Sequence, residues 1–160
     1  MKLFGLWIAV VFAVVAAGAA NAAPREPEFG LPIPVPYAKA AQVIHLAKLG
    51  DVKAQAQLGW MYSTGRGVPQ SYYQAAKWYH LAAAQGHGWA QYELGVLYNK
   101  GEGVPRDYVL AHMWLDLSAS QATGNDRDYK VRMRDAVRQK MTEGQVALAQ
   151  QLARDWYKGR

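Results

Sequence analysis

The chain has 160 residues, no cysteine and a formal net charge of +6. This length leaves room for one domain and a leader. The lack of cysteine excludes a disulfide framework and a lipid anchor on an N-terminal cysteine, so packing alone must hold the fold. The basic excess lies near the C-terminus, where residues 122–160 contain nine Lys or Arg against five Asp or Glu.

Residues 1–22 have the layout of a secretory signal peptide. Lys2 precedes an apolar run over residues 3–17, and Ala20-Asn21-Ala22 forms an A-x-A cleavage site. The alternative is an uncleaved membrane anchor, for which the run is barely long enough. No second long apolar run follows, so we expect no stable membrane insertion after cleavage. The expected location is the periplasm, with release from the cell as the alternative.

Residues 23–36 contain five of the seven prolines. Proline lacks a backbone donor and favours extended polyproline conformations, which predicts a stiff linker outside the core. Two alternatives are an ordered arm lying against the first helix and a ligand for a proline-binding partner.

The folded domain is predicted to span residues 37–160 and to begin with a helix at 37–49. Within that helix, Ala40, Val43 and Ala47 are predicted to face inward, together with Ile44. The spacing of these apolar residues is that of one helix face.

Residues 50–85 and 86–121 are two copies of one pattern, 36 residues apart. A period of this length, with two helices in each unit, predicts a solenoid. The recurring residues, in the numbering of the first copy, are Leu58, Gly59, Tyr62, Gly65, Gly67, Val68, Pro69, Tyr72, Ala75, Trp78 and Leu81.

Each copy is predicted to fold as helix, turn, helix. Asp51 is a good N-cap, and Gly65 can adopt the left-handed conformation that ends a helix. Ser71 and Gln74 have the spacing of a capping box at the start of the second helix, and Asp107 replaces the serine in the second copy.

Two further helices are predicted in residues 122–160 as a C-terminal cap, which gives about seven helices in all. The first opens at Asn125 and has an apolar side formed by Tyr129, Met133, Ala136 and Val137. The second begins with a capping box at Thr142 and Gln145. Its apolar side is formed by Val146, Ala149, Leu152, Ala153 and Trp156.

The pattern AQxxLGxxYxxGxGVPxxYxxAxxW occurs at residues 54–78 and again at 90–114. It resembles the Sel1-like repeat, a relative of the tetratricopeptide repeat. The stretch from 134 to 156 is similar to the terminal cap of many bacterial members, so the resemblance covers nearly all of residues 38–157. It implies an all-α fold, a short right-handed α/α solenoid of antiparallel helix pairs. It also implies an adaptor or scaffold that binds other proteins, with no shared reaction.

One stripe on the first helix of each copy is not explained by packing. Lys53, Gln57 and Trp60 are spaced i, i+4 and i+7 and are offset from the buried stripe of Leu58. We predict that this stripe faces the concave groove. We also predict that Trp60 and Trp89, the tryptophans of the two copies, anchor a partner. The alternative is that both tryptophans pack between repeats, Trp60 against the helix at 37–49. The counterparts in the second copy are Trp89, Glu93 and Val96.

No catalytic constellation is evident, so we predict a non-catalytic protein without a cofactor. None of the four serines is followed three residues later by a lysine, which leaves the SxxK arrangement absent. His112 and Asp116 have the i, i+4 spacing of two metal ligands, but a zinc site needs at least three. We interpret them as surface polar residues or a local pair, and we predict no metal site.

The penultimate helix carries Arg127, Lys130, Arg134 and Arg138 along one flank. This basic patch is predicted to make weak contact with an anionic envelope surface or an acidic protein. The alternative is a cap face kept soluble by its charge. Nucleic acid is not expected, because the chain is exported and lacks interleaved aromatic residues of the stacking type.

The sequence therefore predicts an exported interaction module of the cell envelope that binds a partner protein segment in its groove. The alternative is a protein that binds or hydrolyses cell-wall material, peptidoglycan or β-lactams, with Glu93 and Lys53 among its polar groups.

Overall fold

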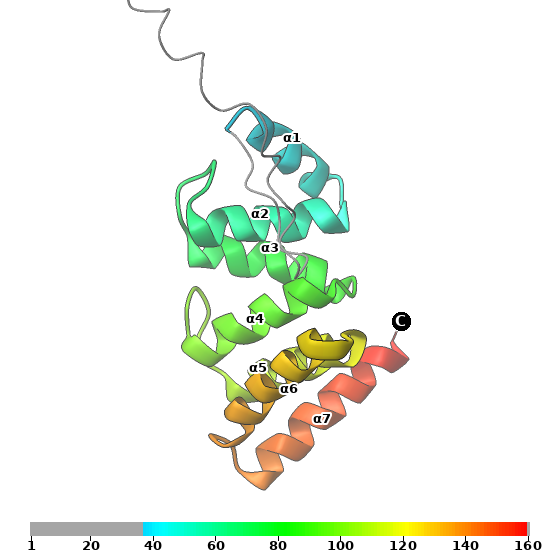
Figure 1. Cartoon of the computed structure of the whole chain (residues 1–160). Coiled ribbons are helices and arrows are strands. Elements are labelled where there is room, and N and C mark those ends of the chain that lie inside the picture. The colour runs from blue at the N-terminus through cyan, green and yellow to red at the C-terminus, as the bar shows by residue number, and fades with distance from the viewer. Residues whose placement is uncertain (1–36, 160) are drawn as a thin grey trace, which may run out of the picture.

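A computed structural model describes residues 37–159, and this range forms seven α-helices. The helices stack along one axis from α1 to α7 (Figure 1), which confirms the predicted all-α solenoid. Within the described range, no helix has both the length and the apolar character needed to cross a membrane. The predicted leader and linker lie outside the described residues. The helices are α1 (Tyr37–Lys48), α2 (Val52–Thr64), α3 (Tyr72–Ala84), α4 (Gly88–Lys100), α5 (Tyr108–Gln121), α6 (Gly124–Arg138) and α7 (Glu143–Lys158).

The helix ends follow from local side-chain chemistry. Asp51, Ser71 and Asp107 each accept a hydrogen bond from the backbone N–H three residues later, at 2.7, 3.3 and 3.0 Å. These bonds satisfy donors that the first turn of a helix leaves unpaired. Gly65 and Gly101 end α2 and α4 in the left-handed conformation, with φ of 73° and 74°. The predicted caps at Asp51, Gly65, Ser71 and Asp107 are confirmed, and of the capping box predicted for Ser71 and Gln74 the bond from the Gln74 N–H to Ser71 is present.

The two helices of each pair approach closely at a glycine. A Cβ atom at Gly59 of α2 would lie 2.5 Å from the ring of Tyr79 on α3. In the second pair, a Cβ atom at Gly95 of α4 would lie 2.8 Å from Leu115 of α5. Packing at the density of a protein interior leaves no room for an extra methyl group at either position. The recurring Leu-Gly dipeptide therefore marks the contact within each helix pair.

Buried glutamines connect successive pairs. The side-chain amide of Gln55 donates to the Ala47 carbonyl at 3.3 Å, and Gln85 donates to the Gln55 side-chain oxygen at 2.7 Å. The same arrangement recurs 36 residues later. Gln91 donates to Ala83 at 3.2 Å and receives a bond of 2.8 Å from Gln121. These bonds satisfy amides that would otherwise be costly to bury.

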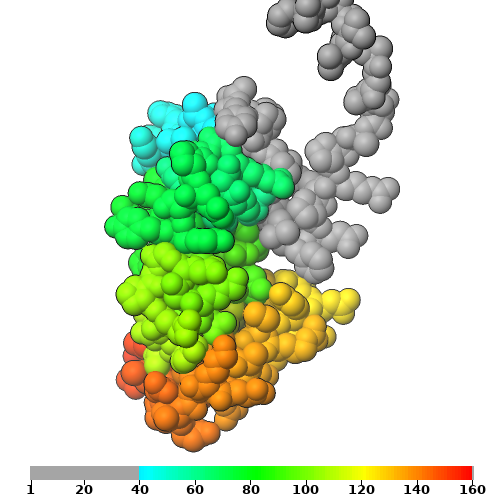
Figure 2. All heavy atoms as spheres, turned by 90° about the vertical axis from the view of Figure 1, so that its left-hand side faces the viewer, coloured from blue at the N-terminus to red at the C-terminus, as the bar shows by residue number. Residues whose placement is uncertain are grey.

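The last two helices both pack on α5, and they lie on opposite sides of the stack (Figure 2). The predicted capping box at the start of α7 is confirmed, because Thr142 and Gln145 each bond to the backbone of the other. The buried stripe of α7 is Val146, Ala149 and Ala153, which agrees with the predicted apolar side.

The predicted apolar side of α6 is only partly correct. Val137 is buried, but Tyr129 and Ala136 are exposed. Lys130, predicted on the basic flank, is buried instead, with 8% of its surface exposed. Its ammonium pairs with Asp126 at 2.9 Å, and this partner offsets part of the cost of burying the charge. The helix is therefore rotated so that Lys130 and Val137, spaced i, i+7, face the core.

Candidate functional site

The predicted groove residues lie on α2 and α4, the first helices of the two repeats. Lys53 is exposed at the start of α2. The two tryptophans pack against the same core cluster, whose members include Ala83 and Leu94. The other five predicted residues are half-buried, namely Gln57, Trp60, Trp89, Glu93 and Val96.

Trp60 contributes to packing and still keeps part of its surface accessible. It contacts the cluster that joins α1 and α2 as well as the cluster around α3 and α4. The guanidinium carbon of Arg66 lies 5.2 Å from the ring centroid. This is the geometry of a cation–π contact, so the accessible part of the ring already attracts a positive charge within the chain.

Trp89 lies edge-on to Tyr79, with ring centroids 5.3 Å apart and an interplanar angle of 83°. The ring of His87 also lies edge-on to Trp89, with the centroids 6.4 Å apart. The indole Nε1 is buried and has no hydrogen-bond partner among the described residues. An indole N–H usually finds a partner when it is buried, and this one is enclosed in the packing around Trp89.

Glu93 lies one turn after Trp89 on α4. Burial raises the pKa of its carboxyl to about 7, against a smaller opposing effect of Lys100. The pKa of Tyr79 is also raised, first by burial and then by the negative charge of Glu93. The Tyr79 hydroxyl lies 3.4 Å from the Ser63 Oγ. A polar cluster thus lies between α2, α3 and α4.

The positive charge of Lys53 also acts on His87, at the start of α4. Burial lowers the pKa of His87, and the positive charge of Lys53 lowers it further. The His87 ring nitrogen Nδ1 accepts a hydrogen bond from the Ala90 N–H at 3.3 Å and so caps α4. The structure therefore brings the exposed lysine of the first stripe near the tryptophan end of the second.

The predicted basic patch is largely ion-paired. Besides the buried Lys130, Arg134 bonds Asp116 and Asp135, each at 2.8 Å. Arg138 lies 4.0 Å from Glu143. Arg127 is exposed. Paired charges attract an external anion less than free ones do, so the patch presents less positive charge than the sequence suggests.

The interpretation of His112 as a surface residue is wrong. Only 2% of its surface is exposed, and its Nδ1 has no hydrogen-bond partner among the described residues. Burial lowers the pKa of this imidazole, so the neutral form is favoured. Asp116, one turn further on, instead pairs with Arg134. In residues 37–159, no group of three His, Cys, Asp or Glu side chains is placed to hold a metal ion.

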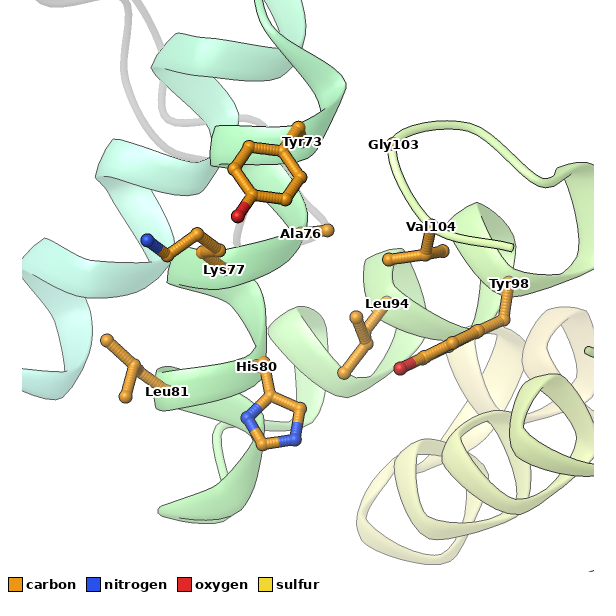
Figure 3. Close-up of a pocket in the computed structure, with 9 residues that line it drawn as sticks. All are labelled: Tyr73, Ala76, Lys77, His80, Leu81, Leu94, Tyr98, Gly103 and Val104. Carbon is orange, nitrogen blue, oxygen red and sulfur yellow. The ribbon is translucent and has the colours of Figure 1, made fainter. Parts of the chain in front are cut away.

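Sequence reasoning missed a groove on the outer side of α3, which we call the α3 groove. It has a volume of about 350 Å³ and runs between α3, α4 and the loop that follows α4. The sequence signals are the replacements of Lys77 by Met113 and of His80 by Asp116 in the second copy. Figure 3 shows its lining residues, which include Tyr73, Lys77, His80 and Leu81 of α3, Leu94 of α4 and Val104 of the loop.

The fold is that of an α-solenoid repeat protein. Its helix pairs are stacked, and the same glycine contacts and glutamine hydrogen bonds recur in each pair. The model of the Sel1 repeat matches residues 52–87 and 90–122. The chain belongs to the Sel1 repeat family. Among curated proteins, none matches the chain significantly.

Two solved structures are similar to the chain. A Sel1 repeat protein from Oxalobacter formigenes is 41% identical with a TM-score of 0.54, and the match covers 59% of this chain and 69% of that one. A protective antigen present in uropathogenic Escherichia coli strains, which displays an SLR fold, is 31% identical with a TM-score of 0.70. That match covers 76% of this chain and 26% of the antigen, so the chain spans about a quarter of its length.

Proposed function

We propose that the chain is an exported, non-catalytic interaction module of the cell envelope. Its binding surface is the face formed by α2 and α4, which receives a segment of a partner protein. Sel1 repeat proteins are commonly protein–protein interaction modules. The leader-like residues 1–22 support export.

The half-buried tryptophans carry this proposal. Trp60 and Trp89 stand on the first helices of adjacent repeats and are packed well enough to be held rigidly. Rigid aromatic side chains with part of their surface open lose little conformational entropy on binding, and tryptophan is enriched among residues that dominate binding energy.

Affinity capture from an envelope extract, with residues 23–160 as bait, tests the proposal. Trp60→Phe combined with Trp89→Phe keeps an aromatic ring at both positions but removes both N–H donors and part of the contact area. We expect recovery of the bound partner to fall about tenfold, while the melting temperature changes by only a few degrees.

Trp78→Phe is the matched control, because Trp78 is also half-buried but lies on α3, outside the face formed by α2 and α4. It should leave partner recovery unchanged. Equal loss in both variants, or no loss in either, contradicts the assignment of the surface. Export is tested separately by cell fractionation and N-terminal sequencing, for which we expect a mature chain that begins at Ala23.

A second candidate function rests on Glu93. A carboxyl with a pKa of about 7 whose negative charge acts on a buried tyrosine is an environment that suits a general acid or a small-ligand site. Incubation with peptidoglycan fragments and β-lactams tests this candidate. Binding or turnover that Glu93→Gln abolishes would favour it over the interaction module.

A further inference from the structure

The α3 groove combines a buried apolar floor with exposed walls. Ala76 and Leu94 form part of the floor and are nearly inaccessible to solvent. Tyr73 and Leu81 rise from α3 with 60% and 46% of their surfaces exposed. The backbone at Gly103 lies so close to Tyr72 that a Cβ atom would overlap it, which seats the loop against α3 as the facing wall.

The second repeat shows what covers the corresponding face of its own second helix. Leu117 is the counterpart of Leu81, and only 1% of its surface is exposed. Met113 is the counterpart of Lys77 and is also buried. Both belong to the core cluster that contains Ala153 of α7. One copy of this face is therefore covered by the amphipathic helix α7, whereas within residues 37–159 the other copy keeps Lys77 and Leu81 exposed.

This face carries more positive charge on α3 than on α5. Lys77 replaces a methionine, and His80 replaces Asp116. The Lys77 ammonium lies 5.7 Å from the Tyr73 ring centroid at the rim, and Lys77 forms no ion pair with a described residue. None of the described residues that line the groove is acidic. Complementary charge on a partner is therefore negative.

We propose that the α3 groove is a second docking site, which binds an acidic amphipathic helix of a partner protein. The packing of α7 on α5 shows how such a helix can bind, because α7 presents small residues and an aromatic residue to the face of α5. The unpaired Lys77 supplies the preference for acidic residues beside the apolar stripe. This site is separate from the face of α2 and α4, and neither proposal depends on the other.

Two stapled peptides with the α7 sequence, residues 143–158, serve as probes. The acidic peptide carries Gln150→Glu and Arg154→Glu, and the basic peptide carries Gln150→Lys and Arg154→Lys. Staples between exposed positions 151 and 155 keep both helical without altering the apolar stripe. Binding to residues 23–160 is followed by NMR titration, which locates the site, and by fluorescence anisotropy, which gives the affinity.

We expect chemical-shift changes in α3 and in the loop at 101–105. The acidic peptide should bind about threefold to tenfold more tightly than the basic one, as expected for one or two exposed ion pairs. Lys77→Met, which restores the residue of the second copy, should abolish this preference but keep apolar binding. Leu81→Asp should weaken both peptides about tenfold or more, because it places a charge on the apolar wall.

Leu148→Asp is the matched control for Leu81→Asp, since Leu148 is 48% exposed on α7 and does not line the groove. It should leave both affinities unchanged. The proposal is overturned if neither peptide binds at about 1 mM, a very weak affinity, or if both bind equally. Shift changes confined to α5, from displacement of the chain's own α7, also overturn it. Self-association in sedimentation that Leu81→Asp abolishes would instead make a second copy the occupant.

Discussion

At the scale of single residues, Glu93 is the side chain whose properties depend most on its surroundings. Nothing in the pattern of the repeat distinguishes it from an ordinary surface glutamate at a groove position. In the folded chain, burial raises its pKa from 4.5 to about 7. The sequence predicts its place on the helix, but its protonation depends on the burial that the tertiary structure imposes.

This pKa predicts how the stability changes with pH. A raised carboxyl pKa means that the folded state holds the proton more tightly, so the contribution is present below about pH 4.5 and is lost as the pH rises through 7. The free energy of unfolding should fall by at most about 3 kcal/mol over this window because of Glu93. Urea unfolding of Glu93→Gln at pH 4.5–8 should show a flatter profile. Glu102→Gln, a change at a surface ion pair, should keep the wild-type slope.

At the scale of the elements, the helix ends could be predicted from the sequence, but the buried face of α6 could not. The caps at Asp51, Asp107 and Thr142 were predictable because a capping side chain bonds its own neighbours three residues away. The buried face of α6 was not, because the ion pair of Lys130 with Asp126 lets a charged residue take a core position. The pattern of apolar residues along the helix does not show that ion pair.

The close contact within a helix pair leads to a direct test. Gly59→Ala places a methyl group 2.5 Å from the Tyr79 ring, and we expect a loss of about 1 to 3 kcal/mol in the free energy of unfolding. Gly144→Ala is the matched control in α7, where the nearest atom is 4.0 Å from the new Cβ. It should be neutral or stabilise by about 0.5 kcal/mol, because alanine favours helix over glycine. Equal effects in denaturant unfolding would show that the contact is not tight.

At the scale of the whole molecule, α7 closes the core on the C-terminal side. It covers Met113, Trp114 and Leu117 of α5, which join Ala153 in one cluster. A repeat array needs an end unit that buries the last apolar face. The two copies differ at this level, since α7 covers α5, whereas the described residues leave the α3 groove uncovered.

Removal of α7 tests this role. A chain that stops at Met141 exposes Met113 and Leu117, and each buried side chain contributes about 1.5 to 3 kcal/mol. We expect loss of the cooperative thermal transition and binding of a hydrophobic dye, measured by circular dichroism and fluorescence. The full-length variant Leu148→Asp alters only the exposed side of α7 and should keep the transition. A truncated chain with an unchanged transition would mean that the first six helices are stable without α7.

Of the candidate site, the sequence could place the six groove residues on their helices, because the stripe follows from helical spacing and from the comparison of the two copies. It left open whether Trp60 and Trp89 form contact surface or packing. The structure gives each a share of both, since each ring is half-buried against the core and partly open. The α3 groove could not be predicted, because its walls come from α3 and from a loop about thirty residues further along the chain.

The sequence by itself determined the class of fold, the number of helices in the described range, most helix ends and the frame of the repeat. These depend on interactions between near neighbours and on a period that the two copies display. The tertiary structure alone decided which half-buried side chains stay accessible, that His112 and Lys130 are buried, and which copy of a repeated face is left open. Those properties depend on contacts between residues far apart in the chain, and a local pattern carries no information about such contacts.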